Sequence, residues 1–238
     1  MKVLSIVQRG QCIVALLFFV SCSQEATIAI AEDDASMPEQ FVVVNDEIPS
    51  LVFDIRYYSN DNFLGTKVRG YESAKCILTR PASEALKKVQ RDISEVGYAL
   101  KIFDCYRPQQ AVDHFVAWVR DADDQKMKAE YYPNEDKSQL IEKGYIADKS
   151  GHSRGSTLDL TLVESASSAE LDMGTPFDYF DALSNTDDPL ISEQQRRNRL
   201  LLKSAMEKHG FVNYDKEWWH YTLKDEPYPD AYFDFPVK

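Results

Sequence analysis

Ser150-Gly-His-Ser-Arg-Gly-Ser-Thr-Leu-Asp-Leu-Thr-Leu162 leads from a loop rich in serine and glycine into a run in which polar and apolar residues alternate. The alternation over residues 157–162 predicts a β-strand that turns its leucines to one face of a sheet and Asp159 to the other. Aspartate is disfavoured within a strand unless something holds it, and His152 lies in the loop that enters the strand. The stretch therefore predicts both a strand and a polar site on one of its faces.

A second stretch, Glu217-Trp-Trp-His220, adds another imidazole and another carboxylate. Taken alone, His152 would be a solvated loop residue and His220 a buried neutral histidine. Together with Asp159 they offer three nitrogen and oxygen ligands. A catalytic zinc is held by three such ligands with one position open, whereas a structural zinc is closed by four, usually including thiolates. The set therefore predicts a metal-dependent hydrolase.

Two charged residues are candidates for the chemistry beside such a metal. Glu217 is three residues from His220, so it can share the site without binding the ion, and it can take a proton from the attacking water and return it to the leaving amine. Arg107, in Asp104-Cys-Tyr-Arg-Pro108, offers paired donors to an oxyanion or a substrate carboxylate. The alternatives are a surface carboxylate for Glu217 and an ion pair with Asp104 or another acid for Arg107.

Apolar periodicity elsewhere predicts helices and short strands. The expected helices cover residues 79–96, 108–119 and 192–209. Thr79 and Ser192 stand where N-caps are expected, and Gln195 would complete a capping box with Ser192. His114 and His209 lie on these helices without a partner in view and are expected to be structural. The expected strands are 41–44, 51–58, 99–103, 157–162, 211–214 and 218–223.

Composition and charge limit the class of protein. The 238 residues are 44% hydrophobic and 28% charged, which suits one globular domain. The order of the predicted elements indicates the α+β class with a mainly antiparallel sheet. A net charge of -12 argues against nucleic acid or an anionic membrane surface as a partner, whereas a small peptide stays compatible. No feature of the sequence specifies an oligomeric state.

The N-terminus has the order of a bacterial secretory signal, with basic residues, an apolar run at 13–20 and then small and polar residues. The run is too short to span a bilayer, and a buried N-terminal helix is the alternative. Two cleavage sites compete, one before Cys22, which would then carry a lipid anchor, and one after Ala31. We expect export to the periplasm. The expected segments are a signal at 1–21 (alternatively 1–31), a polar tether at 22–39 and a domain at 40–238.

The four cysteines divide into two pairs. Cys12 and Cys22 belong to the leader, and Cys76 and Cys105 belong to the body of the chain. In an oxidising compartment the latter two can form a disulfide, which would contribute about 3 to 4 kcal/mol by closing the intervening loop. The alternative is two buried thiols. A metal role is disfavoured, because neither lies in a Cys-x-x-Cys pair.

Four motifs together resemble the D-alanyl-D-alanine dipeptidases of the VanX type, zinc enzymes of the DD-peptidase and hedgehog-like fold. The motifs are Asp104-Cys-Tyr-Arg-Pro108, Ser150-x-His-x-x-Gly-x-x-x-Asp159, Met173-Gly-Thr-Pro-Phe-Asp178 and Glu217-x-Trp-His220. The resemblance runs from about residue 40 to the C-terminus with all four motifs in order. It is specific because the motifs occur in combination.

This resemblance implies one zinc ion per chain in a central cleft, held by His152, Asp159 and His220. It implies hydrolysis of the small D,D-dipeptide D-alanyl-D-alanine to two D-alanine, with Glu217 as the catalytic base and Arg107 stabilising the tetrahedral intermediate. Four further residues are implied to lie near the ends of the dipeptide: Tyr57, Tyr71, Ser150 and Asp178.

Two features depart from the family. Thr157 stands where alanine is frequent, which should not abolish metal binding, and the resistance-type enzymes act in the cytoplasm. The nearest alternative function is a zinc DD-carboxypeptidase or endopeptidase acting on peptidoglycan stem peptides. A non-catalytic hedgehog-like binding module is disfavoured by the presence of both Glu217 and Arg107. Serine hydrolysis through Ser150 or Ser153 lacks a Gly-x-Ser-x-Gly elbow.

Overall fold

The structure, a computed structural model, describes residues 36–238. The expected signal at 1–21 or 1–31, the lipidation site at Cys22 and most of the tether at 22–39 lie outside the described residues. None of the described helices combines the length and the hydropathy that a membrane span requires.

A five-stranded sheet forms the centre of the described chain, with its strands in the order β2, β4, β5, β7, β6. β2 runs parallel to β4, and the other neighbouring pairs are antiparallel. The prediction of a mixed fold with a mainly antiparallel sheet is therefore confirmed. The strands are β2 Val52–Phe53, β4 Tyr98–Asp104, β5 Thr157–Glu164, β7 His220–Leu223 and β6 Phe211–Asn213, while β1 Phe41–Val43 and β3 Ile77–Thr79 form a separate antiparallel pair.

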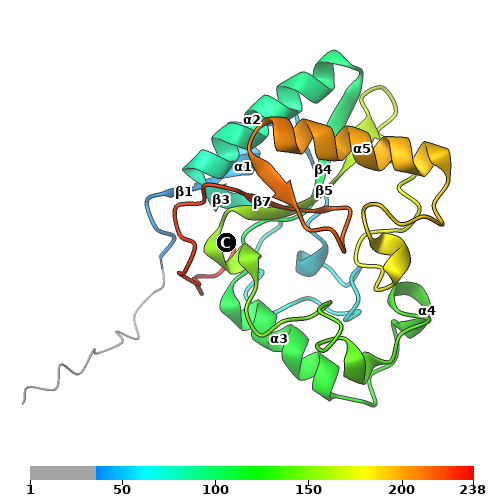
Figure 1. Ribbon diagram of the computed structural model, residues 1–238. Coiled ribbons are helices and arrows are strands. Elements are labelled where there is room, and N and C mark those ends of the chain that lie inside the picture. The colour runs from blue at the N-terminus through cyan, green and yellow to red at the C-terminus, as the bar shows by residue number, and fades with distance from the viewer. Residues whose placement is uncertain (1–35) are drawn as a thin grey trace, which may run out of the picture. The chain divides into compact units, whose positions relative to one another are not determined.

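Three long helices cover the sheet. Helices α2 and α5 lie together on one side of it, and α3 lies on the opposite side (Figure 1). The bounds are α2 Arg80–Glu95, α3 Gln109–Arg120 and α5 Glu193–Lys208, with short helices α1 Val44–Glu47 and α4 Lys128–Tyr131 and 3-10 turns η1 Arg56–Tyr58, η2 Lys137–Gln139, η3 Gly151–Arg154 and η4 Ala182–Ser184. All three predicted helices are confirmed.

The predicted helix caps have different outcomes. Ser192 caps α5, and the capping box with Gln195 is complete. Thr79 occupies the N-cap position of α2, but its side chain makes no capping hydrogen bond. Its hydroxyl pairs instead with the Ser156 hydroxyl at 2.7 Å. The capping prediction for Thr79 is therefore wrong, because a buried partner from another segment competes for the hydroxyl.

The strand predicted at 51–58 is wrong beyond Phe53. Residues Arg56–Tyr58 form a 3-10 turn instead, and the Asn62 side-chain amide donates to the carbonyls of Arg56, Ser59 and Thr66. These hydrogen bonds hold the backbone in a loop. The spacing of the apolar residues does not predict this loop.

Strand β5 is buried on both faces. The leucine face is fully buried at Leu158, Leu160 and Leu162, and Asp159 on the other face is only 1% exposed. A half-buried strand would turn its polar face to water. Here the polar face is covered instead. It forms the floor of a site on the side of the sheet where α3 lies.

Cys76 and Cys105 form a disulfide with their Cα atoms 5.2 Å apart. Cys76 directly precedes β3 and Cys105 directly follows β4. The bond therefore joins the small two-stranded sheet to the end of a central strand.

Candidate metal centre

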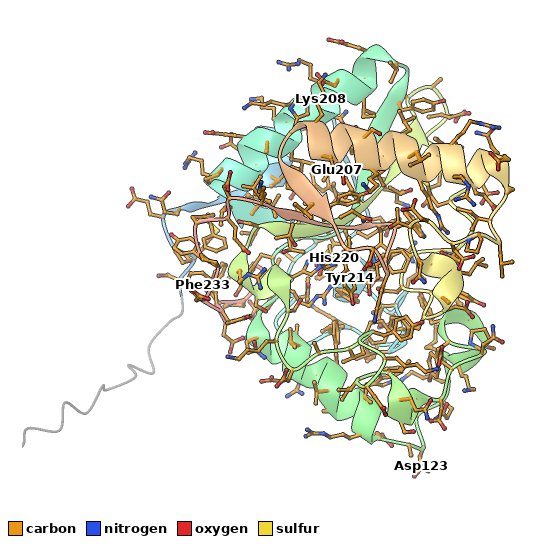
Figure 2. The ribbon with its side chains drawn as sticks, viewed as in Figure 1. Asp123, Glu207, Lys208, Tyr214, His220 and Phe233 are labelled. Atoms are coloured by element: carbon orange, nitrogen blue, oxygen red, sulfur yellow. A yellow bond between two sulfur atoms is a disulfide. The ribbon has the colours of Figure 1, made fainter. Side chains whose placement is uncertain are left out.

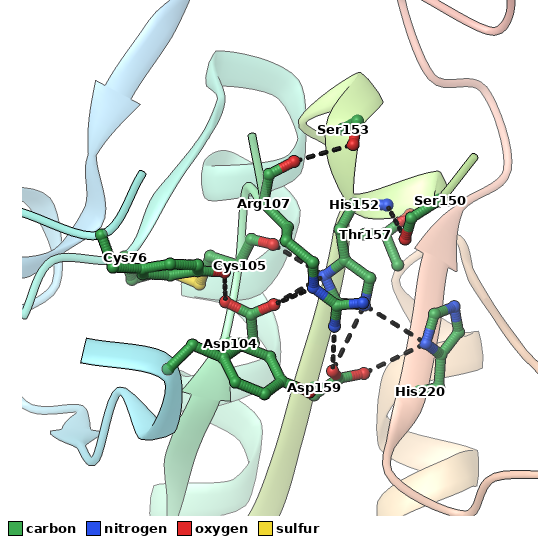
Figure 3. A network of polar contacts seen from close by, with 12 residues as sticks. Cys76, Asp104, Cys105, Arg107, Ser150, His152, Ser153, Thr157, Asp159 and His220 are labelled. Carbon is green, nitrogen blue, oxygen red and sulfur yellow. Dashed lines mark hydrogen bonds and ion pairs between the residues drawn. A yellow bond between two sulfur atoms is a disulfide. The ribbon is translucent and has the colours of Figure 1, made fainter. Parts of the chain in front are cut away.

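Three side chains from three elements converge at the middle of the sheet (Figure 3). His152 comes from η3, Asp159 from β5 and His220 from the start of β7. Asp159 and His220 are opposite each other in the antiparallel register of β5 and β7. Each residue offers one ligand atom, and these atoms all lie within 4.8 Å of one another. Among the described residues this is the one group of three or more such side chains that could hold a metal.

The ring of His152 is oriented for metal binding. Its Nδ1 lies 2.7 Å from the carbonyl oxygen of Cys105. A carbonyl can only accept, so Nδ1 carries the proton and Nε2 presents its lone pair. Burial, with the nearby guanidinium of Arg107, lowers the pKa of His152 and keeps the ring neutral. This is the arrangement that fixes the tautomer of a metal-binding histidine.

The candidate ligand atoms of this group face one another. Nε2 of His152 lies 3.2 Å from Oδ2 of Asp159 and 3.3 Å from Nδ1 of His220. Oδ1 of Asp159 is buried and makes no hydrogen bond within the described chain, although Nδ1 of His220 is 3.1 Å away. A cation among these atoms would satisfy the carboxylate. Two imidazoles and one carboxylate are a donor set that suits zinc.

Glu217 lies beside the group without belonging to it. Its Oε2 is 3.5 Å from Nδ1 of His220. Burial raises the pKa of Glu217 to about 7, although His220 opposes the rise. A carboxyl group with a pKa near neutrality can both accept and return a proton.

Arg107 forms an ion pair with Asp104, which was the alternative to a role in the site. It also reaches the metal group. Nε donates to Oδ2 of Asp104 at 2.9 Å, and Nη2 donates to Oδ2 of Asp159 at 3.3 Å. The guanidinium lies over the rings of Tyr57 and Phe115. Asp104 therefore orients the guanidinium, and one edge of it stays directed at the metal group.

The residues expected near the substrate ends divide into two groups. Tyr57, Ser150 and Asp178 line the cavity beside the metal group. The Tyr57 hydroxyl donates to Oδ2 of Asp178 at 2.8 Å, and burial raises the pKa of Asp178 well above its ordinary value. Tyr71 does not line this cavity, and its hydroxyl donates to Asp104 at 2.6 Å.

The remaining sequence candidates have structural partners. The hydroxyl of Thr157 pairs with that of Thr222 at 2.9 Å, across the β5–β7 pair. His114 accepts from the backbone N–H of Arg69, and His209 pairs with Asp92. The two histidines therefore lie outside the site, as predicted.

The cavity has a volume of about 230 Å³. Some of the residues that form its wall were not predicted from the sequence. Tyr145 and Ile146 come from the loop after η2, in an irregular charged stretch that carried no motif. Tyr214 closes another side, with its ring 5.7 Å from that of His220 (Figure 2). Tyr214 lies three residues before Glu217 in the sequence, and this proximity could have identified it as a residue of the site.

The chain is similar to known peptidases over most of its length. The family model for peptidase M15, described as D-ala-D-ala dipeptidase, matches residues 37–238. A D-alanyl-D-alanine dipeptidase of Enterococcus faecium is 42% identical over 83% of this chain and 98% of the relative. One from Streptomyces coelicolor is 39% identical over 84% of this chain and 100% of the relative. One from Escherichia coli is 34% identical over 74% of this chain and 80% of the relative.

The residues matched by the family model include the whole candidate site, namely the metal group, Glu217 and Arg107. The chain therefore belongs to the D-ala-D-ala dipeptidase family of M15 peptidases and is a peptidase.

Proposed function

We propose that this peptidase hydrolyses the free dipeptide D-alanyl-D-alanine to two D-alanine with one zinc ion per chain. The relatives that carry this name match it over nearly their whole length. One observation carries the proposal: a single cavity is lined by Asp159 and His220 of the metal group and by the buried carboxyl group of Asp178. Asp178 accepts a hydrogen bond from the Tyr57 hydroxyl. Burial raises its pKa, and the ammonium group of a free dipeptide would favour the ionised carboxylate and pair with it.

The zinc would be held by His152, Asp159 and His220. When bound, zinc supplies a Lewis acid that polarises the scissile carbonyl and brings the pKa of the attacking water toward about 7.

Two side chains perform the remaining chemistry. Glu217 accepts the proton of the attacking water on a carboxylate oxygen and delivers it to the leaving nitrogen. Arg107 donates to the oxyanion of the tetrahedral intermediate from the edge that faces Asp159, while Asp104 accepts from Nε and holds the guanidinium in place.

The size of the cavity favours the free dipeptide over a stem peptide. Its volume of about 230 Å³ lies below the range of about 300 to 1,000 Å³ that is usual for sites of drug-sized ligands. Tyr145 and Phe180 stand in its wall, where a longer N-terminal extension would need room. The related DD-carboxypeptidase or endopeptidase function is therefore the second choice.

We also propose that the chain is exported to the periplasm, with a lipid on Cys22 as its anchor, and that it has the DD-peptidase and hedgehog-like fold. The disulfide between Cys76 and Cys105 supports export, because disulfides persist in oxidising compartments. The antiparallel sheet with the metal group on one face supports the fold.

The test is release of D-alanine by the purified mature chain. Samples stripped with a chelator and samples restored with zinc receive D-alanyl-D-alanine or a pentapeptide that ends in it. We expect zinc-dependent cleavage of the dipeptide alone. Cleavage of the pentapeptide would move the enzyme to the carboxypeptidases, and cleavage of neither would point to a binding module.

A further inference from the structure

The disulfide lies within the motif that supplies Arg107. Cys105 stands between Asp104, which orients the guanidinium, and Arg107 itself. Both half-cystines are buried, with Cys76 0% and Cys105 1% exposed. Figure 3 shows the disulfide next to the polar network of the site.

The backbone of Cys105 holds a metal-ligand candidate directly. Its carbonyl oxygen accepts from Nδ1 of His152 at 2.7 Å. The ladder between β4 and β5 shifts register between Ile102 and Asp104, and β4 ends at Asp104. Cys105 therefore lies beyond the regular sheet, where the ladder no longer fixes its carbonyl.

The other half of the disulfide is well anchored. The Cys76 N–H donates to Oδ1 of Asn45, and the Cys76 carbonyl accepts from the N–H of Val44, both at 2.9 Å. Cys76 is thus tied to α1 on one side and continues into β3 on the other. The disulfide ties Cys105 to this anchored residue. A hydrogen bond from the N–H of Tyr106 to the carbonyl of Ile77 joins the same two segments.

We propose that the Cys76–Cys105 disulfide is a positioning element of the metal centre. By fixing the carbonyl of Cys105 it fixes the tautomer and the direction of the His152 ring, so the oxidised chain binds zinc more tightly than the reduced chain. The inference rests on the proposed zinc function. It implies that the metal site matures where disulfides form.

The experiment compares zinc affinity by competition with a chromophoric chelator. The wild type is set against Cys76→Ala/Cys105→Ala, and Val89→Ala serves as the control. Val89 is buried in α2, away from the site, so its truncation lowers stability without touching the disulfide or the metal group. Removing an outer partner of a metal-binding histidine costs about ten- to hundred-fold in metal affinity. The double variant keeps the carbonyl but no longer holds it in place, so we expect a loss of about ten-fold in zinc affinity. The control should keep wild-type affinity.

A second readout reports the ring itself. In metal-free protein, nitrogen NMR of the imidazoles should show His152 as the single Nδ1–H tautomer in the wild type and in Val89→Ala. A mixture of tautomers is expected in the double variant. A merely stabilising cross-link would leave this spectrum unchanged.

If the double variant does not fold, zinc affinity is measured on wild-type protein reduced with a phosphine. The S–S bond breaks, water supplies two protons to give two thiols and its oxygen to the phosphine, and the phosphine is oxidised to its oxide. Equal zinc affinity in oxidised and disulfide-free protein would overturn the inference and leave the proposed function standing. Failure of the wild type to bind zinc at all would overturn both.

Discussion

Asp104 and Asp159 lie opposite each other on adjacent antiparallel strands, and the guanidinium of Arg107 bridges their carboxylates. Both aspartates are buried, and Asp178 and Glu217 line the same cavity as Asp159. Four carboxyl groups thus surround one arginine. Burial raises the pKa of Asp104, Asp178 and Glu217. A divalent cation is the charge that would balance such a group.

Arg107→Lys should lower kcat by about 10² to 10³, because an ammonium cannot hold Asp104 and present a second donor to the oxyanion at the same time. Zinc content should stay stoichiometric. The matched control is Arg56→Lys, which alters an arginine paired with Asp54 and Asp61 outside the cavity. Steady-state kinetics with metal analysis checks both variants, and an unchanged kcat in Arg107→Lys would remove its assigned role.

Glu217→Gln should keep the metal and lose about 10² to 10⁴ in kcat, because the amide cannot take up the proton of the attacking water. Glu207→Gln is the control, since Glu207 is exposed on α5 and pairs with Lys203. Zinc stoichiometry and kcat are measured side by side. Normal turnover in Glu217→Gln would show that another group is the base.

The raised pKa of Glu217 predicts how the stability of the metal-free protein depends on pH. The ordinary pKa is 4.5, and the folded value is about 7. Between these values the folded carboxyl binds the proton more tightly than the unfolded one, so this stabilising term is present below pH 4.5 and is lost as pH rises toward 7. The loss is at most roughly 3 kcal/mol.

Glu217→Gln removes that loss, because the amide stays neutral. In chelator-treated protein we expect the variant to be more stable than the wild type at pH 8 and nearly equal to it at pH 4. Urea unfolding at the two pH values measures the difference. A variant less stable than the wild type at pH 8 would contradict the burial-driven shift.

The metal group was predictable because local patterns determine it. The alternation of β5 assigns Asp159 to the polar face, and antiparallel pairing brings His220 opposite it. The register of Asp104 against Asp159 was not predictable, because it depends on the irregularity after Ile102 in β4. The resulting pairing of Asp104 with Asp159 leaves both carboxylates within reach of Arg107.

The wall of the cavity was beyond sequence reasoning for a different reason. Tyr145 and Ile146 follow a charged stretch that contains one buried cation, Lys137. The Lys137 ammonium donates to the carbonyls of Asp121 and Asp124 and lies 4.0 Å from the ring centre of Trp118. Such long-range backbone contacts leave no periodic signal in the sequence.

Arg199 should position the loop that carries Asp178. Its guanidinium is buried and donates to the carbonyls of Met173, Leu183 and Asn185. Arg199→Leu leaves these acceptors without a donor, which should destabilise the fold by about 3 kcal/mol or more.

Asp178 has a positive φ of 61°, a conformation that the surrounding loop must hold in place. If the loop is loosened, Asp178 should leave this conformation. We expect KM for the dipeptide to rise more than kcat falls, with zinc affinity unchanged. Arg197→Leu, at an exposed position two residues away, should have little effect. Equal KM values in the two variants would show that Arg199 serves stability alone.

Gly155 ends the turn that carries His152 and has a φ of +82°. A Cβ atom there would meet the ring of Phe41 at 2.1 Å, so something must move. Gly97 has a similar φ of +88°, yet an added Cβ would meet nothing within 4 Å. Both alanine variants carry the cost of a left-handed backbone, about 1 kcal/mol, and Gly155→Ala adds the clash. We therefore expect Gly155→Ala to unfold at clearly lower urea concentration than Gly97→Ala and to bind zinc more weakly, because the displaced turn carries His152. Equal unfolding midpoints would mean that Phe41 yields freely and that the packing of this ring does not hold the turn.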